Sequence, residues 1–281
     1  MSILPAMPND GQPPAGAEHA AEHRPELLEL RVLDGPNRFL TRPAVKLEFG
    51  ADAPGAAAEA AATAGLAIRR LHVALDYPAP RVTLRTSVDR LRVALAFPWR
   101  RRAIAQSIAA AAARLALGEA SERRELRALR SVTPGPRPDL PRPRVPIVAV
   151  TGTNGKSTTT RLIAHVAESA GRRTGMTNSD GIYLRGELVE AGDWTGFGGA
   201  GRVLSEPDLD LAVLETARGG ILLRGIGYLA NDVSVVTNVS ADHLGLQGID
   251  TLDELADVKA AVVRITRRAG WAVLNAADPR R

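Results

Sequence analysis

The first half of the chain carries short stretches of alternating apolar and polar residues separated by turn-forming segments. Such alternation is typical of half-buried antiparallel strands, in which successive side chains point to opposite faces. Asp34-Gly35-Pro36-Asn37 marks the first turn. We therefore predict a small α+β domain. Its strands are expected at residues 26–33, 44–49, 81–87 and 90–97, and its helices at residues 54–66, 100–117 and 121–130.

After residue 146 the pattern changes to short, nearly uninterrupted apolar runs with helical stretches between them. An apolar run without alternation suits a strand that is covered on both faces, as in a parallel sheet. Helical stretches at residues 157–171 and 252–268 intervene. This order predicts an α/β fold with a doubly wound, mostly parallel sheet. Its strands are expected at residues 147–150, 209–214, 233–237 and 271–274.

A proline-rich segment separates the two patterns. Residues 133–146 hold six prolines, which exclude a helix or an inner strand and favour a stiff linker. The first residues are rich in Pro, Gly and Ala and carry little periodicity. The predicted organisation is a flexible tail (1–24), a small α+β domain (25–132), the linker (133–146) and an α/β domain (147–281). No internal repeat is visible.

Composition restricts the class of protein. The chain has 281 residues, of which 45% are hydrophobic and 24% charged, and its mean hydropathy is -0.07, as in soluble globular proteins. Cysteine is absent, which excludes disulfides and thiolate metal sites. The N-terminus does not resemble a signal peptide, and the most apolar stretch, Ala103–Leu117, is shorter than the roughly 20 residues that a bilayer requires. We therefore expect a cytoplasmic protein with no membrane partner.

The positive charge does not by itself indicate a nucleic-acid partner. The formal charge is +5, but residues 1–144 carry +7 and the remainder −2. Arginine supplies 33 of the 36 basic residues, and only Lys46, Lys156 and Lys259 are lysines. The arginine run at residues 100–102 follows two aromatic residues, yet aromatics make up only 4% of the chain and no nucleic-acid module is visible. A solvated helix start is therefore preferred, with guidance of an acidic peptide or polymer as the alternative.

A glycine-bearing turn between a buried strand and a helix carries the clearest chemistry. Glycines let backbone amides approach an anion, the helix N-terminus adds its positive dipole end, a lysine meets the terminal phosphates and a serine binds Mg²⁺. The standard P-loop has a glycine where Val150 stands, so this is a variant. A plain strand-to-helix turn is the alternative. The predicted ATP-binding residues are Gly152, Thr153, Asn154, Gly155, Lys156, Ser157 and Thr158.

Two side chains that follow predicted parallel strands are candidates for binding a divalent cation. Glu215 follows residues 209–214, and His243 follows residues 233–237 after a short loop. The carboxyl ends of parallel strands open at the same rim as the glycine turn. A carboxylate and an imidazole beside a triphosphate suit a divalent cation. Taken alone, the glutamate is as readily a surface residue, and the histidine is more often structural.

Lys259 lies on the apolar face of the last predicted helix. Thr251 and Glu254 form a capping box at its start, and Lys259 follows Leu255 by four residues and precedes Val263 by four. In one interpretation, the aliphatic part of the side chain packs against the core while the ammonium reaches solvent. In the other, burial of the whole side chain lowers the pKa of the amine and leaves it nucleophilic. The pattern leaves both interpretations open.

Several segments of the C-terminal half resemble the Mur ligase superfamily of ATP-dependent amide ligases. The nearest likeness is to the ligase half of cyanophycin synthetases, over residues 147–278, and Gly35-Pro-Asn37 is a weaker likeness in the N-terminal half. The segments are Thr151–Thr158, Ser179-Asp-Gly-Ile-Tyr183, Gly192-Asp-Trp-Thr-Gly196, Leu214-Glu-Thr-Ala-Arg-Gly-Gly-Ile-Leu222 and Val236-Thr-Asn-Val-Ser-Ala-Asp-His-Leu-Gly245. The implied fold is a Mur ligase central domain.

The resemblance also implies roles for individual residues. The equivalents of Glu215 and His243 bind the catalytic Mg²⁺ in that family, with Ser157 as a further ligand here. A lysine at a position similar to Lys259 is carbamylated by CO₂ and supports a second Mg²⁺. Asn238, Asn275 and Asp278 resemble nucleotide contacts, although turn residues after strands are an equally good interpretation. Ala277 replaces the first of two adjacent acids that are common in the family.

The implied activity is ATP-dependent ligation of an acid to an amino acid. Transfer of the γ-phosphoryl group to a carboxylate gives an acyl phosphate, which an amine attacks to form an amide. Lys156 and Lys259 would be the catalytic lysines. The expected partners are ATP, Mg²⁺, an amino acid and a peptide or polymer that bears a carboxylate.

Two departures from the family leave alternatives. The proline linker stands where cyanophycin synthetases carry an ATP-grasp domain, and the chain stops at Arg281, where the family's C-terminal domain would begin. Three alternatives follow. The sequence is a fragment of a longer protein, the protein is a non-catalytic ATP-binding module, or another chain or a second copy completes its site. A P-loop kinase is a further alternative, which would not need His243 and Lys259.

Overall fold

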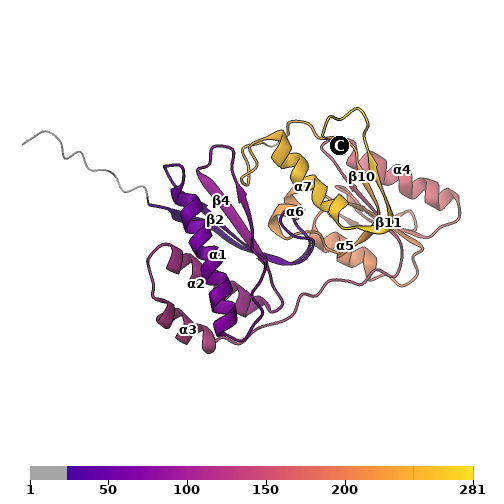
Figure 1. Ribbon diagram of the computed structural model, residues 1–281. Coiled ribbons are helices and arrows are strands. Elements are labelled where there is room, and N and C mark those ends of the chain that lie inside the picture. The colour runs from indigo at the N-terminus through magenta and orange to yellow at the C-terminus, as the bar shows by residue number, and fades with distance from the viewer. Residues whose placement is uncertain (1–23, 243, 281) are drawn as a thin grey trace, which may run out of the picture.

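The computed structural model describes residues 24–242 and 244–280, which are arranged around two separate β-sheets (Figure 1). A four-stranded sheet belongs to the N-terminal half, and a seven-stranded sheet to the C-terminal half. Residues 131–146, which contain neither helix nor strand, connect the halves where the sequence predicts the linker. Apart from Arg24, the predicted tail lies outside the described residues.

The N-terminal sheet is antiparallel, in the order β1-β2-β4-β3. Along β2, Val45, Leu47 and Phe49 point into a core that α1 and α2 cover. Lys46 and Glu48 alternate with them and point to the other face, which carries charged side chains. The elements are β1 Glu26–Leu33, β2 Ala44–Gly50, α1 Ala56–Ala74, β3 Thr83–Thr86, β4 Arg92–Pro98, α2 Arg102–Ala116 and α3 Glu122–Arg130.

The C-terminal sheet has the order β11-β10-β5-β9-β6-β7-β8. Strands β11 to β6 in this order are parallel, and β7 and β8 complete the edge in antiparallel pairing. The strands are β5 Ile147–Thr151, β6 Thr174–Thr177, β7 Gly181–Leu184, β8 Glu187–Ala191, β9 Leu211–Glu215, β10 Asn231–Val236 and β11 Thr266–Leu274.

Helices cover both faces of this sheet. Ile147 and Ala149 of β5 pack with α5, α6 and α7 on one face, whereas Val150 packs with α4 on the other. The prediction of a doubly wound, mostly parallel α/β sheet is therefore confirmed. None of the described helices is long and apolar enough to cross a bilayer. The helices are α4 Lys156–Ser169, α5 Phe197–Leu204, α6 Arg218–Leu223 and α7 Leu252–Arg264.

Three details of the predicted elements are wrong. The helix expected at residues 252–268 ends at Arg264, because the chain then enters β11 and pairs with β10. The strand expected at residues 271–274 is part of β11, but as an edge strand it is not covered on both faces, and Trp271 is 74% exposed. The helix expected at residues 54–66 continues to Ala74. Strands β6 to β8 and helices α5 and α6 were not predicted.

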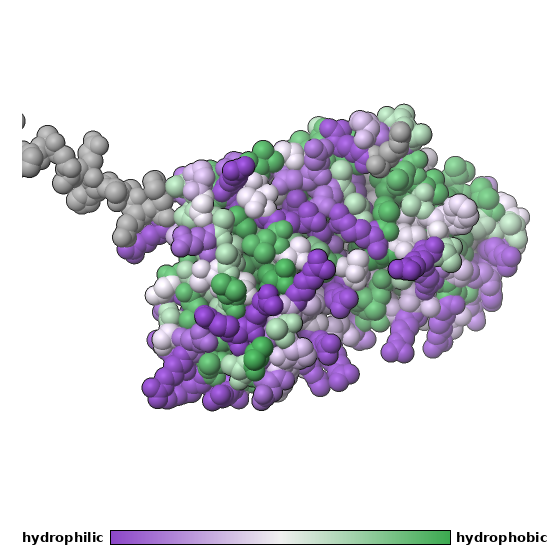
Figure 2. Space-filling model, viewed as in Figure 1, coloured by the Kyte–Doolittle hydropathy of each residue, from purple (hydrophilic) through white to green (hydrophobic). Residues whose placement is uncertain are grey.

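The two halves meet through a backbone contact at the turn that follows β1. Asp34 N donates a hydrogen bond to Arg224 O over 2.7 Å, and Ile226 N donates one to Pro36 O over 2.6 Å. A Cβ atom on Gly35 would lie 1.8 Å from Ile226 O, so this approach requires glycine. Hydrophilic side chains gather between the N-terminal sheet and α7 on the face shown in Figure 2.

Candidate functional site

The glycine loop, residues 152–155, connects β5 to α4 at the carboxyl end of the parallel sheet. Gly155 caps α4 with φ 77°, and Gly152 has φ 148°, conformations that side chains disfavour. A Cβ atom on Gly152 would also lie 1.9 Å from the Thr237 hydroxyl oxygen. The chain therefore needs glycine at both ends of this turn.

The segment after β10 holds the glycine loop in shape. Asn154 N donates to Asn238 Oδ1 over 3.1 Å, and Asn238 Nδ2 donates back to Asn154 O over 3.1 Å. Thr237 Oγ1 also donates to Asn154 O, over 2.7 Å, and Thr153 Oγ1 donates to Ser240 O over 3.2 Å. Both amide atoms of Asn238 are thus occupied by the loop backbone. Its predicted contact with the nucleotide stays a prediction.

Lys156, Ser157 and Glu215 meet at the N-terminus of α4. Lys156 Nζ donates to Thr153 O over 2.8 Å, so the ammonium lies over the loop. Ser157 Oγ donates to Glu215 Oε2 over 2.7 Å and lies 3.1 Å from Ser179 Oγ. The structure thus brings together the residues that the sequence singles out on β9 and α4.

Glu215 is only 4% exposed at the end of β9. Burial raises its pKa, and the charges of Asp193 and Asp180 add to this, while the Ser157 hydrogen bond and the Lys156 charge act in the opposite direction. A buried carboxylate beside a hydroxyl is the oxygen donor set that Mg²⁺ accepts, and a cation there would compensate the buried negative charge. These two residues fit a divalent cation.

Lys259 of α7 also contacts the glycine loop. It is 4% exposed, and its Nζ donates to Gly152 O over 2.6 Å. Burial lowers its pKa to about 8, and the charges of Lys156 and Arg218 act in the same direction. The predicted buried position and the Thr251–Glu254 capping box are confirmed. The interpretation in which the ammonium reaches solvent is wrong, because the side chain ends at a buried carbonyl.

The remaining predicted residues lie around this centre. Thr158 is exposed on the first turn of α4, and Asn275 is exposed after β11. Asp278 Oδ2 accepts a hydrogen bond from Val239 N over 2.6 Å and lines, with Asn275 and Lys259, a cavity of about 130 Å³ beside α7. His243 lies outside the described residues. Among residues 24–242 and 244–280, no group of three or more His, Asp or Glu side chains is placed to hold a metal ion.

Sequence reasoning gave no role to three polar residues near Glu215. Ser179 contacts Ser157, and the charges of Asp180 and Asp193 act on Glu215. Ser179 and Asp180 lie between β6 and β7, and Asp193 follows β8, none of which was predicted as a strand. These three residues could have been found from the sequence, because they lie in two of the segments that resemble the Mur ligases, residues 179–183 and 192–196.

Comparison with known proteins finds similarity in the C-terminal half. Residues 150–281 match the Mur ligase middle domain. The chain is 53% identical over 136 residues to cyanophycin synthetase of Crocosphaera subtropica, covering 48% of this chain and 16% of that protein. It is 35% identical over 136 residues to UDP-N-acetylmuramoylalanine--D-glutamate ligase of Symbiobacterium thermophilum, covering 48% of this chain and 26% of that protein.

A solved structure of UDP-N-acetylmuramoyl-L-alanyl-D-glutamate--2,6-diaminopimelate ligase is also similar. It has a TM-score of 0.40 and 25% sequence identity, and the match covers 56% of this chain and 30% of that one. The chain therefore spans less than a third of each of these relatives.

Proposed function

Because residues 150–281 match the Mur ligase middle domain, we propose that this chain binds ATP and takes part in ATP-dependent amide ligation. The observation that carries this proposal is the meeting of Lys156, Ser157 and Glu215 at the N-terminus of α4, directly after a glycine loop. The relatives that share this half are named cyanophycin synthetase and UDP-N-acetylmuramoylalanine--D-glutamate ligase.

The glycine loop would hold the phosphates of ATP. The backbone amides at the start of α4 and the positive end of its dipole face this loop. Lys156 is already held over the loop by the Thr153 carbonyl, so a short movement of the ammonium would bring it to the terminal phosphates. The contacts from Thr237 and Asn238 keep the loop in shape before ATP arrives.

Ser157 and Glu215 would hold Mg²⁺, with His243 as the third ligand that the family resemblance implies. When bound, Mg²⁺ neutralises charge on the phosphates and on the transferring phosphoryl group. Glu215 holds its carboxylate at the end of a buried strand, and Ser157 fixes its orientation through the 2.7 Å hydrogen bond.

In the proposed reaction a substrate carboxylate oxygen attacks the γ-phosphorus of ATP, and ADP leaves. An amine nitrogen then attacks the carbonyl carbon of the acyl phosphate, phosphate leaves, and the amine gives up a proton to form the amide. Lys156 stabilises negative charge on the transferring phosphoryl group, and the loop amides position it. The amine is an amino acid, and the carboxylate belongs to a peptide or polymer.

Lys259 would support this chemistry as a carbamate. With a pKa near 8, a larger fraction of the Lys259 amine is neutral at physiological pH than in an ordinary lysine. Only the neutral amine attacks CO₂. Formation of the carbamate would replace a buried positive charge by a negative one close to the cation site. Intact-mass spectrometry in bicarbonate tests this, because a chain with no gain of one CO₂ would contradict it.

Binding of MgATP is the first experiment. We expect the wild-type chain to bind MgATP in isothermal titration calorimetry, and Lys156→Ala and Gly152→Ala each to weaken binding by about tenfold or more. Gly219→Ala is the matched control, because a Cβ atom on Gly219 would meet no neighbour within 4 Å. Equal binding by Gly152→Ala and wild type would contradict a phosphate-binding role for the loop.

Turnover is the second experiment. Product release from MgATP is measured across amino acids, arginine included, with and without acidic peptide primers. Release of ADP and phosphate that depends on both an amino acid and a carboxylate primer, together with a new amide bond, supports the ligase. MgATP binding without such turnover supports a binding module, and a phosphorylated acceptor without amide formation supports a kinase.

A further inference from the structure

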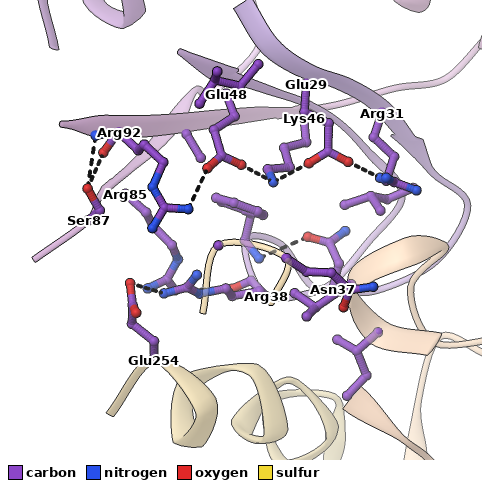
Figure 3. Close-up of a pocket in the computed structure, with 18 of the residues that line it drawn as sticks. Glu29, Arg31, Asn37, Arg38, Lys46, Glu48, Arg85, Ser87, Arg92 and Glu254 are labelled. Carbon is purple, nitrogen blue, oxygen red and sulfur yellow. Dashed lines mark hydrogen bonds and ion pairs between the residues drawn. The ribbon is translucent and has the colours of Figure 1, made fainter. Parts of the chain in front are cut away.

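A second cavity lies between the two halves, away from the glycine loop. It has a volume of about 370 Å³, within the range of small-molecule sites, which begins near 300 Å³. The charged face of the N-terminal sheet lines one side of it (Figure 3). The loop after β1, helix α6, residues 247–248 and the start of α7 line the rest.

The sheet side of this cavity is a row of charges that alternate in sign. The row crosses β1, β2 and β4 in the order Arg31, Glu29, Lys46, Glu48, Arg92 (Figure 3). Lys46 Nζ donates to Glu29 Oε2 over 2.7 Å and also to Glu48, and Arg31 donates to Glu29. Arg92 Nη1 lies 3.9 Å from Glu48 Oε1.

A second set of charges faces the row (Figure 3). Arg38 Nη2 lies 3.6 Å from Glu254 Oε1, and Arg85 reaches this set from β3 of the N-terminal sheet. Arg85 Nε is buried and has no hydrogen-bond partner in the structure. A buried guanidinium donor without an acceptor is unfavourable, and a ligand oxygen would satisfy it.

The centre of the row is not explained by contact between the halves. Arg92, at the end of the row, pairs across the junction with Asp250, and Arg38 and Arg85 pair with Asp257. In the described part of the chain, the ion pairs of Glu29, Lys46 and Glu48 are all with residues of the N-terminal sheet. Lys46 is nevertheless only 9% exposed. Burying such a row costs desolvation energy that apolar residues would avoid, so packing alone does not account for it.

We propose that this cavity binds a small zwitterionic ligand, an amino acid or dipeptide that carries both a carboxylate and a cationic group. The carboxylate would accept hydrogen bonds from Arg85 and Arg38, whose planar donors suit it. The cationic group would lie against Glu29 and Glu48 on the facing row. A ligand with charge of one sign would contact favourably only one of these two sets of groups. This proposal does not require the chain to be a ligase.

Binding by the full chain, without ATP, tests the proposal. Isothermal titration calorimetry is run with the charged L-amino acids, glycine and the dipeptides glutamyl-lysine and lysyl-glutamate, and with succinate and putrescine as ligands of a single sign. We expect at least one zwitterion to bind about tenfold more tightly than succinate or putrescine. If no zwitterion binds, or if a ligand of one sign binds as tightly, the proposal is wrong.

Two variants locate the binding. Glu48→Gln removes a carboxylate that would face the cationic group, and Ala94→Leu fills the cavity from β4 without removing a charge. Each is expected to weaken binding of the zwitterion by about tenfold. Glu122→Gln is the matched control, because this half-buried residue lies outside the cavity and pairs, within the described residues, with Arg70 of the same half. Folding is checked by circular dichroism; a folded Ala94→Leu protein with unchanged affinity would overturn the assignment of this cavity.

Discussion

Burial of Lys259 couples the stability of the fold to pH. Its folded-state pKa is about 8, whereas the ordinary value is 10.5. Below pH 8 the folded and unfolded states are both protonated, and the folded state carries the full cost of a buried charge. Between pH 8 and pH 10.5 the folded state releases its proton while the unfolded state keeps it. The contribution of Lys259 to the free energy of unfolding therefore rises with pH in this window.

We predict that this rise is visible against Lys259→Met. The free energy of unfolding of the wild type, minus that of the variant, should increase by about 2 kcal/mol between pH 7 and pH 10, since one pKa unit corresponds to about 1.4 kcal/mol. Urea unfolding at several pH values measures it. A difference that stays constant over this range would show that the amine is not desolvated as described.

Local sequence predicts the burial of such residues better than it predicts their partners. The spacing of Lys259 from Leu255 and Val263 places it on the buried face of α7, because a helix repeats every 3.6 residues. Its acceptor, Gly152 O, is 107 residues away in the sequence, and only the crossing of α7 over β5 brings them together. The hydrogen bond between Ser157 and Glu215 depends in the same way on the pairing of β5 with β9.

At the scale of elements, the N-terminus of α7 is the most specific local signal. Thr251 Oγ1 accepts from Glu254 N over 3.2 Å, and the Glu254 carboxylate accepts from Thr251 N over 3.2 Å. We predict that Thr251→Ala lowers the free energy of unfolding by about 1 kcal/mol, because it leaves a helix N–H without its acceptor. Chemical denaturation measures this value.

Ser121→Ala is the matched control for the capping experiment. Ser121 also precedes a helix, α3, but its side chain makes no capping hydrogen bond. Its replacement should therefore change stability by less than Thr251→Ala does. Equal losses in the two variants would argue against the capping box as the cause.

Elements were predictable where one local signal dominated. The apolar run of β5, followed by Gly155 and a helical stretch, predicts strand, turn and helix within a residue or two. Strand β8, Glu-Leu-Val-Glu-Ala, is exposed throughout and lacks both an apolar run and strict alternation. No glycine or proline separates α7 from β11, so the local sequence pattern predicts a helix that continues to Arg268. There the pairing with β10 prevails over local preference.

At the scale of the whole molecule, the prolines of residues 133–146 predict a connection but not how the halves meet. The turn at residues 34–37 is visible in sequence, yet its contact with residues 224–226 requires the C-terminal fold. The cavity at the junction forms only where the charged face of one sheet is covered by α6 and α7 of the other half. No local pattern contains that information.

Asp257 of α7 ties the two halves together. It accepts from Arg38 Nε over 2.9 Å, lies 2.7 Å from Arg85 Nη1 and also pairs with Arg264 of its own helix. Burial alone would raise its pKa, but hydrogen bonds from Arg38 and Arg264 and the charges of Arg264 and Arg85 hold that pKa below its ordinary value. Its contribution to stability is therefore complete above the ordinary pKa, near 3.9, and is lost as pH falls through the folded value.

We predict that Asp257→Asn loosens the junction at neutral pH, because it leaves Arg38 and Arg85 without their shared carboxylate. Within residues 131–146, Arg144 is followed by valine, whereas Arg137 and Arg142 are followed by proline and resist trypsin, so cleavage after Arg144 reports on separation of the halves. Cleavage should be several-fold faster in this variant, and unfolding easier by about 2 kcal/mol. Asp253→Asn on the same helix is the control, since that side chain is 87% exposed and, within residues 24–242 and 244–280, pairs with Arg280. If both variants are cleaved at the wild-type rate, the halves are held mainly by the backbone contact at Gly35, and the arginines around Asp257 serve the cavity instead.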